Sequence, residues 1–145
     1  MRLVVQRVSQ AKVKVDHQIV GEIDKGYLVY VGIKESDTKD IVKKAAQKVH
    51  TLRVFEDDEG KMNLNLSTAN GKILAISQFT LYGDTKGNNR PSFIEAARPE
   101  HALPLFDFFI ETLKKDHHVE KGVFGAKMMI ESINDGPVTI IMEFD

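Results

Sequence analysis

The chain has no cysteine. Disulfides, thiolate nucleophiles and cysteine-rich metal sites are therefore excluded. It also has no apolar run that approaches the roughly 20 residues of a membrane-spanning helix. Residues 1–7 meet charge too soon for the apolar core of a signal peptide. We expect a cytoplasmic protein without a membrane partner.

Neither sign of charge is in excess, because 20 Lys and Arg stand against 21 Asp and Glu. A strongly basic chain would indicate a nucleic-acid binder, since phosphate neutralisation dominates such affinity. The net charge of −1 lowers that expectation, although a protein that grips only the end of an RNA needs few phosphate contacts. The length of 145 residues suits one domain, 1–145, with its own core.

Alternating and continuous apolar runs predict a sheet. Residues 3–15 alternate in two series with a slip between them, which indicates a bulged strand with one buried face. A turn at 16–18 leads to a hairpin partner at 19–23, and the almost wholly apolar run 26–33 is typical of a central strand. Further strands are predicted at 71–77, 126–133 and 138–144, the last two joined by a turn at 134–137.

Helical spacing appears twice. Ile41, Ala45 and Val49 predict a first helix, which Ser36 or Asp37 would cap. A second helix is expected from about Pro99 to Lys115, with Pro104 in its first turn and a buried stripe formed by Phe106, Phe109, Ile110 and Leu113. This order predicts an α+β fold: a mostly antiparallel sheet, sandwich-like or barrel-like, with two main helices.

Two segments carry more polar chemistry than folding requires. Ser77–Asp84 gathers hydroxyls and an amide where a buried strand ends. It is either a strand end bonded to nearby backbone or a set of donors that holds a substrate carbonyl in an oxyanion hole. Asn134–Thr139 has the composition of a hairpin turn. No His-x-x-x-His or Glu-x-x-His pair supports a metal site.

Several segments, in order along the chain, resemble the D-aminoacyl-tRNA deacylase (D-tyrosyl-tRNA deacylase) family. The matching segments are Met1–Val8, Ser77–Leu81, Lys86–Gly87, Arg90–Phe93, Gly122–Ala126 and Asn134–Thr139. The resemblance covers essentially the whole length. It implies a hydrolase that cuts the ester of D-aminoacyl-tRNA and releases the D-amino acid and the tRNA, a proofreading step in translation quality control.

The resemblance also implies a homodimer with two symmetric sites, each binding the 3′ end of an aminoacyl-tRNA and requiring no cofactor or metal. In the family the Gly-Pro bond, Gly136–Pro137 in this sequence, is cis and enters the partner's site. Its carbonyls would take the substrate's α-ammonium and exclude L side chains. Glycyl-tRNA, including glycine mischarged on tRNA-Ala, is then expected to be accepted. Arg7 matches the residue that would hold this loop by a charge-assisted bond to a carbonyl.

The catalytic group has two candidates. The hydroxyl of Thr80 could be a nucleophile, but no adjacent base is visible. We favour the alternative, in which the 2′-OH of the terminal adenosine assists hydrolysis while the Phe79 and Thr80 amides stabilise the oxyanion. The expected catalytic residues are Ser77, Gln78, Phe79 and Thr80, and the expected substrate-binding residues are Arg7, Phe124, Gly125, Ala126, Gly136 and Pro137.

Two other functions stay open at this point. A paralogue with a trans Gly136–Pro137 bond could edit L-alanyl-tRNA on the same scaffold. A relative that kept the fold and lost catalysis could bind nucleic acid. The sequence does not reveal the preferred amino acid or tRNA, or bound ions.

Overall fold

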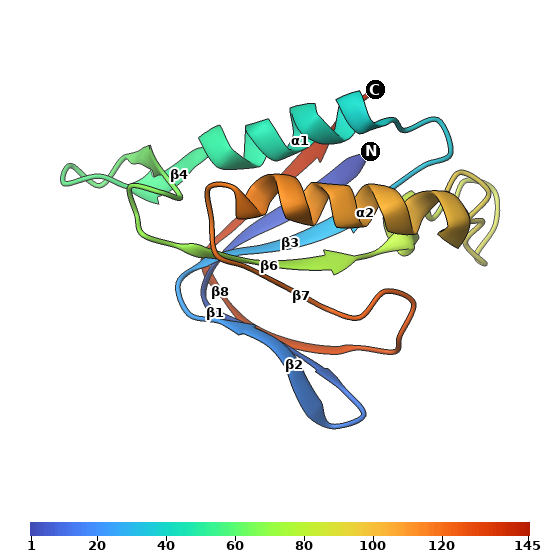
Figure 1. Cartoon of the computed structure of the whole chain (residues 1–145), viewed down its shortest axis with the longest axis horizontal. Coiled ribbons are helices and arrows are strands. Elements are labelled where there is room, and N and C mark those ends of the chain that lie inside the picture. The colour runs from blue at the N-terminus through green and yellow to red at the C-terminus, as the bar shows by residue number, and fades with distance from the viewer.

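Two helices lie side by side on one face of a curved sheet (Figure 1). The computed structural model describes residues 1–145. The elements in order are β1 (Arg2–Val15), β2 (Gln18–Ile23), β3 (Gly26–Gly32), α1 (Lys39–Thr51), β4 (Arg53–Glu56), β5 (Met62–Asn65), β6 (Lys72–Ser77), the 3-10 turn η1 (Phe79–Tyr82), α2 (Pro99–Lys114), β7 (Val119–Lys121) and β8 (Met129–Glu143). Neither helix is long and apolar enough to cross a membrane.

The main sheet has six strands in the order β2-β1-β3-β6-β7, with β8 also paired to β1. Pairs of β1 with β2, β3 and β8 are antiparallel, and β3–β6 and β6–β7 are parallel. A separate antiparallel ribbon joins β4 and β5. The predicted α+β class, with a mostly antiparallel sheet and two helices, is confirmed.

The sheet curls toward a barrel because β1 and β8 bend along their length and carry β2 below the rest of the sheet (Figure 1). Gly21 of β2 shows how near the closure is. A Cβ at Gly21 would lie 2.9 Å from the carbonyl oxygen of Lys121 in β7. Glycine therefore permits a backbone approach that no other residue allows here.

The central strands β3 and β6 are buried on both faces. Tyr27 and Val29 face the large core under the helices, whereas Leu28, between them, belongs to a smaller core inside the curl. In β6, Ile73 and Leu74 divide in the same way. Burial on both faces explains why these strands are continuous apolar runs in the sequence.

The strand prediction is right at the start of the chain and wrong at its end. β1 is the expected bulged strand, with register shifts against β8 on either side of Val8. Residues 126–133 and 138–144 do not form a hairpin, because β8 is one strand and both of its halves pair with β1. The turn residues between them bulge out of a single strand instead of reversing it.

The predicted caps Ser36 and Asp37 of the first helix are wrong. Thr38 is the N-cap, and its side chain accepts a hydrogen bond from the N–H of Ile41. Asp37 is unavailable for this role because its buried carboxylate lies 2.6 Å from the Met1 ammonium and accepts from the N–H of Lys34. The carboxylate thus fixes the start of the chain beside α1.

The second helix has the predicted buried stripe, since Phe106, Phe109 and Ile110 are at most 2% exposed. Pro104, however, lies inside the helix and not in its first turn. Proline lacks the N–H that would bond the carbonyl of Glu100, one turn back. Both residues are exposed, so water can satisfy that carbonyl.

Candidate active site

An apolar cavity of about 600 Å3 opens where β3 and β6 end, next to the N-terminus of α2. Its lining comes from five segments that are far apart in the sequence. The lining residues are Val31, Ile33, Ser77, Gln78, Phe79, Phe93, Ala96, Ala97, Arg98, Pro99, Ala102, Phe124, Gly125, Ala126, Met128 and Ile130. Hydrophobic side chains predominate, and the polar groups concentrate at the end of β6.

The turn after β6 is fixed by backbone bonds. The Gln78 N–H donates to the carbonyl of Val31 at 2.8 Å, which binds the turn to the end of β3. Arg2 donates to the carbonyl of Leu81 at 2.6 Å, and its guanidinium lies 4.8 Å from the ring centre of Tyr82. Burial raises the pKa of the Tyr82 phenol, so this ring stays neutral. The turn is held at both ends.

The side chains of this turn differ in burial. Ser77 and Gln78 are half-buried, whereas Phe79 and Thr80 are exposed. The Gln78 amide donates to the Thr80 hydroxyl, and the Phe79 ring meets Phe93 edge-on at 5.2 Å between centroids. No carboxylate or imidazole is hydrogen-bonded to Thr80, so its hydroxyl has no base in this chain.

The opposite wall of the cavity is the loop between β7 and β8. Phe124 packs toward Phe106 of α2, with 6.3 Å between the ring centroids. Gly125 has φ of 76°, a conformation that favours glycine. The N–H of Ala126 returns to the carbonyl of Val123 at 3.2 Å, which closes a tight turn. These bonds present Phe124, Gly125 and Ala126 to the cavity.

The Gly136–Pro137 segment lies elsewhere on the molecule. Between Gln6 and Val8 of β1 the pairing with β8 skips Arg7, while on β8 it skips residues 135–138. The four residues of β8 therefore leave the sheet as a loop, and Gly136 and Pro137 are exposed. The Gly136–Pro137 bond is cis, the isomer that the family resemblance implies, and Gly136 has φ of 123°.

Arg7 lies beneath this loop with 5% of its surface exposed. Its Nη1 donates to the carbonyl of Val54 at 2.7 Å, and its Nε lies 3.2 Å from the Asp135 carboxylate. Glu56 supplies a second carboxylate at 3.9 Å. Arg7 therefore contacts the loop through the Asp135 carboxylate, whereas the carbonyl that it bonds belongs to β4 and not, as predicted, to the loop. Burial raises the pKa of the neighbouring Tyr27 phenol, and the charge of Arg7 opposes that effect.

The structure brings six of the ten predicted site residues to one cavity. These are Ser77, Gln78, Phe79, Phe124, Gly125 and Ala126, with Thr80 beside them. Arg7, Gly136 and Pro137 are not there. The cavity turn contacts Arg2, whereas the loop lies over Arg7, five residues along β1 and about 17 Å away at ~3.3 Å per residue.

Other residues of the cavity were not predicted as site residues. Phe93, Ala97 and Arg98 reach it from the segment before α2. Met128, just before β8, and Ile130, near the start of β8, reach it from the other side. Phe93 is the one that the sequence could have indicated as a site residue, because an aromatic ring is unusual in so polar a loop. The described chain gathers no group of three His, Asp or Glu side chains that could hold a metal ion.

Solved structures identify the class of fold. The c-Myc DNA unwinding element binding protein superposes with a TM-score of 0.93 at 37% identity, covering 99% of this chain and 98% of that one. A probable eukaryotic D-amino acid tRNA deacylase superposes with a TM-score of 0.85 over 97% of each chain, at 16% identity. At that identity the second likeness shows the fold alone.

Sequence comparison then identifies the family. The family model described as D-Tyr-tRNA(Tyr) deacylase matches residues 4–143. D-aminoacyl-tRNA deacylases of Fusobacterium nucleatum and Lactobacillus gasseri are 54% and 51% identical to this chain over 144 residues. The alignments cover 99% of this chain in both cases, and 95% and 99% of those proteins respectively. The chain belongs to the D-Tyr-tRNA(Tyr) deacylase family.

Proposed function

We propose that the protein hydrolyses the ester bond of D-aminoacyl-tRNA in the cytoplasm and so removes D-amino acids that were attached in error. The observation that carries this proposal is the Ser77–Thr80 turn, which sets polar groups at the rim of an apolar cavity. Its volume, about 600 Å3, falls in the range of cavities that take small molecules. Family relatives that share half of this sequence are named for the same reaction.

The terminal adenosine of the tRNA would occupy this cavity. Phe79 and Phe124 supply aromatic walls for a flat base, and Ser77 and Gln78 supply the polar groups that orient it. The 3′ ester then lies at the mouth, next to the exposed Thr80. A site that grips one nucleoside needs few phosphate contacts, which agrees with the net charge of −1.

Hydrolysis would proceed with the help of the substrate. Water adds to the ester carbonyl carbon, the bond to the 3′ oxygen breaks, and the vicinal 2′-OH relays the water's proton to that oxygen. The Phe79 and Thr80 N–H groups open η1, and the first amides of a helical turn have no acceptor within it. They are therefore suited to stabilise the oxyanion.

Chirality would be read by a second copy of the chain. The Gly136–Pro137 loop is exposed and too far from the cavity of its own chain, so a homodimer is needed to bring the two together. Exposed apolar side chains on the same strand, those of Met129, Ile133 and Ile141, give such a dimer apolar surface to bury. The loop carbonyls would hold the substrate's α-ammonium and exclude any L side chain.

Four substrates test this function. The purified protein should deacylate D-tyrosyl-tRNA and glycyl-tRNA-Ala and leave L-tyrosyl-tRNA and L-alanyl-tRNA intact. Ala126→Trp, which fills the cavity, is the control and should abolish both activities. Selective attack on L-alanyl-tRNA would favour the paralogous editor. Inactivity on all four substrates would favour a nucleic-acid-binding relative, and inert glycyl-tRNA would contradict selection by exclusion.

A further inference from the structure

The loop at residues 135–138 must have a defined shape if it is to read a substrate. It leaves β8 at Asn134 and rejoins the sheet pairing at Thr139. Asp135, Gly136 and Pro137 are exposed, and only Val138 packs into the core. The buried Arg7 contacts the Asp135 carboxylate at the start of the loop. Its hydrogen bond to a carbonyl, however, goes to Val54, which is outside the loop. Neither contact involves the Gly136 or Pro137 carbonyl, so the base of the loop is the next place to look for what sets their direction.

Asn134 closes the neck of the loop. Its Nδ2 donates to the carbonyl of Arg7 at 3.0 Å and to the carbonyl of Val138 at 3.1 Å. Arg7 pairs with Tyr27 of β3, but the pairing with β8 skips it, and buried backbone acceptors are rarely left unpaired. One side chain thus bonds both strands across the base of the loop.

The oxygen of the Asn134 amide is also fully hydrogen-bonded. Its Oδ1 accepts from the Thr139 hydroxyl at 3.3 Å and from the Gln6 amide at 3.4 Å, and Gln6 also donates to that hydroxyl at 3.3 Å. An asparagine side chain offers two donors and one oxygen with two lone pairs. All four are used here, and a flipped amide would turn its oxygen toward the two backbone carbonyls.

We infer that Asn134 is the positioning residue for chirality reading: it holds the 135–138 loop in the one shape whose carbonyls meet the substrate's α-ammonium. This inference rests on the proposed function. Asn134 does not touch the substrate, and it acts through the loop that it closes. Aspartate is nearly the same size, but it would turn a carboxylate oxygen toward two backbone carbonyls and force the neck open.

The test compares Asn134→Asp with the wild type on D-tyrosyl-tRNA and L-tyrosyl-tRNA. We expect kcat/KM on the D substrate to fall about 100-fold, since a displacement of about 1 Å can have that effect. The ratio of D to L activity should fall as well, because a displaced loop stops excluding L side chains. Asn65→Asp is the matched control, since its oxygen accepts from the Thr68 N–H and a carboxylate does the same.

A second pair of variants decides the matter if Asn134→Asp fails to fold. Thr139→Val removes the hydroxyl at nearly constant volume and should lower the ratio of D to L activity. Thr139→Ser keeps the hydroxyl and should have the wild-type ratio. An unchanged ratio in every folded Asn134 and Thr139 variant, beside an active wild type, would overturn the inference and leave the proposed function standing. An inactive wild type would overturn both.

Discussion

Thr80 is the residue on which the chemistry can be tested most simply. Its hydroxyl is exposed and accepts a bond from Gln78, with no base attached. We therefore expect Thr80→Ala to keep activity within about tenfold of the wild type, because its backbone N–H remains. A 2′-deoxy terminal adenosine should lower the rate at least ~100-fold, since it removes the proton relay. Single-turnover rates with both substrates measure the two effects.

Thr80→Ser serves as the matched control for this experiment, since it retains a hydroxyl and should behave like the wild type. Complete inactivity of Thr80→Ala, with full activity on the 2′-deoxy substrate, would assign the reaction to the threonine and contradict substrate assistance.

At this scale the sequence predicts residues with unusual chemistry better than it predicts their neighbours. Ser77 and Gln78 stand out as polar groups after an apolar strand, and both line the cavity. Met128 and Ile130 line it too, yet nothing in their local sequence distinguishes them from core residues. Which apolar side chains face a cavity depends on packing between distant segments, and a local pattern cannot show that.

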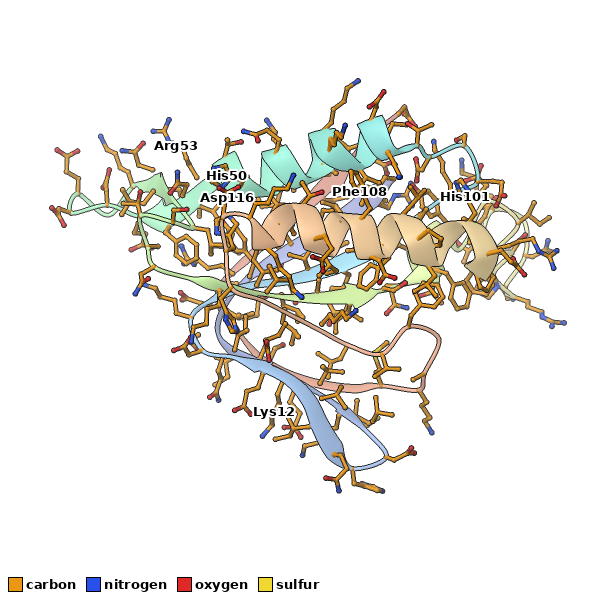
Figure 2. The ribbon with its side chains drawn as sticks, viewed as in Figure 1. Lys12, His50, Arg53, His101, Phe108 and Asp116 are labelled. Atoms are coloured by element: carbon orange, nitrogen blue, oxygen red, sulfur yellow. The ribbon has the colours of Figure 1, made fainter.

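The two helices are joined at one end by a histidine pair. His50 is in the last turn of α1 and His117 follows α2, and their ring nitrogens lie 2.9 Å apart. Figure 2 shows His50 and Asp116 at the same end of the helix pair. Burial and the nearby His50 lower the pKa of His117, while Asp116 opposes this. A hydrogen bond between two imidazoles requires at least one of them to be neutral.

This pair should make stability depend on pH. The pKa of His117 is lower in the folded state than in the unfolded state, where it is about 6.5. Its contribution to the free energy of unfolding is therefore fully present above the unfolded-state pKa and is lost as the pH falls through the folded-state pKa. The free energy of unfolding should therefore decrease from about pH 7 to pH 5 more steeply in the wild type than in His117→Gln. Urea unfolding at each pH measures this difference.

His17→Asn is the control for the histidine pair. His17 is exposed and has φ of 66°, which asparagine tolerates, so this variant should keep the wild-type slope. Equal slopes for the wild type and His117→Gln would show that the pair does not couple the helices to pH.

Elements that follow from the periodicity of apolar side chains were predicted well. Elements that were inferred from turn residues were predicted poorly. The stripe of α2 and the slip in β1 follow from side-chain spacing, and both are present. Asn134–Pro137 has ideal turn residues, yet here they form an outward bulge in one long strand. The same residues suit a turn that reverses the chain or a bulge that keeps its direction. The outcome is decided by β1, with which the segments on both sides of residues 135–138 pair.

At the scale of the whole molecule, the cavity and the Gly136–Pro137 loop, which are the two parts of the proposed site, lie apart. The cavity lies at the Arg2 end of β1 and the loop lies over Arg7, so we expect that one chain does not use both on one substrate. No local feature of the sequence indicates this separation. In the proposed twofold dimer, each loop would enter the other chain's cavity, and the two sites would be equivalent. The central claim is therefore that each site is shared between two copies.

Mixing two inactive variants tests this claim directly. Ala126→Trp blocks the cavity and leaves the loop intact. Gly136→Val distorts the loop, because a Cβ at this position would lie 2.6 Å from the Val138 side chain. It leaves the cavity intact. Circular dichroism first checks that each is folded. Each variant alone should be inactive on D-tyrosyl-tRNA.

The two variants are then unfolded together in equal amounts, refolded and assayed. Half of the dimers should be mixed and each of these has one intact site, so about a quarter of the wild-type activity should return. Activity that stays at the level of the separate variants, in a sample shown to contain mixed dimers, would contradict a site shared between two chains.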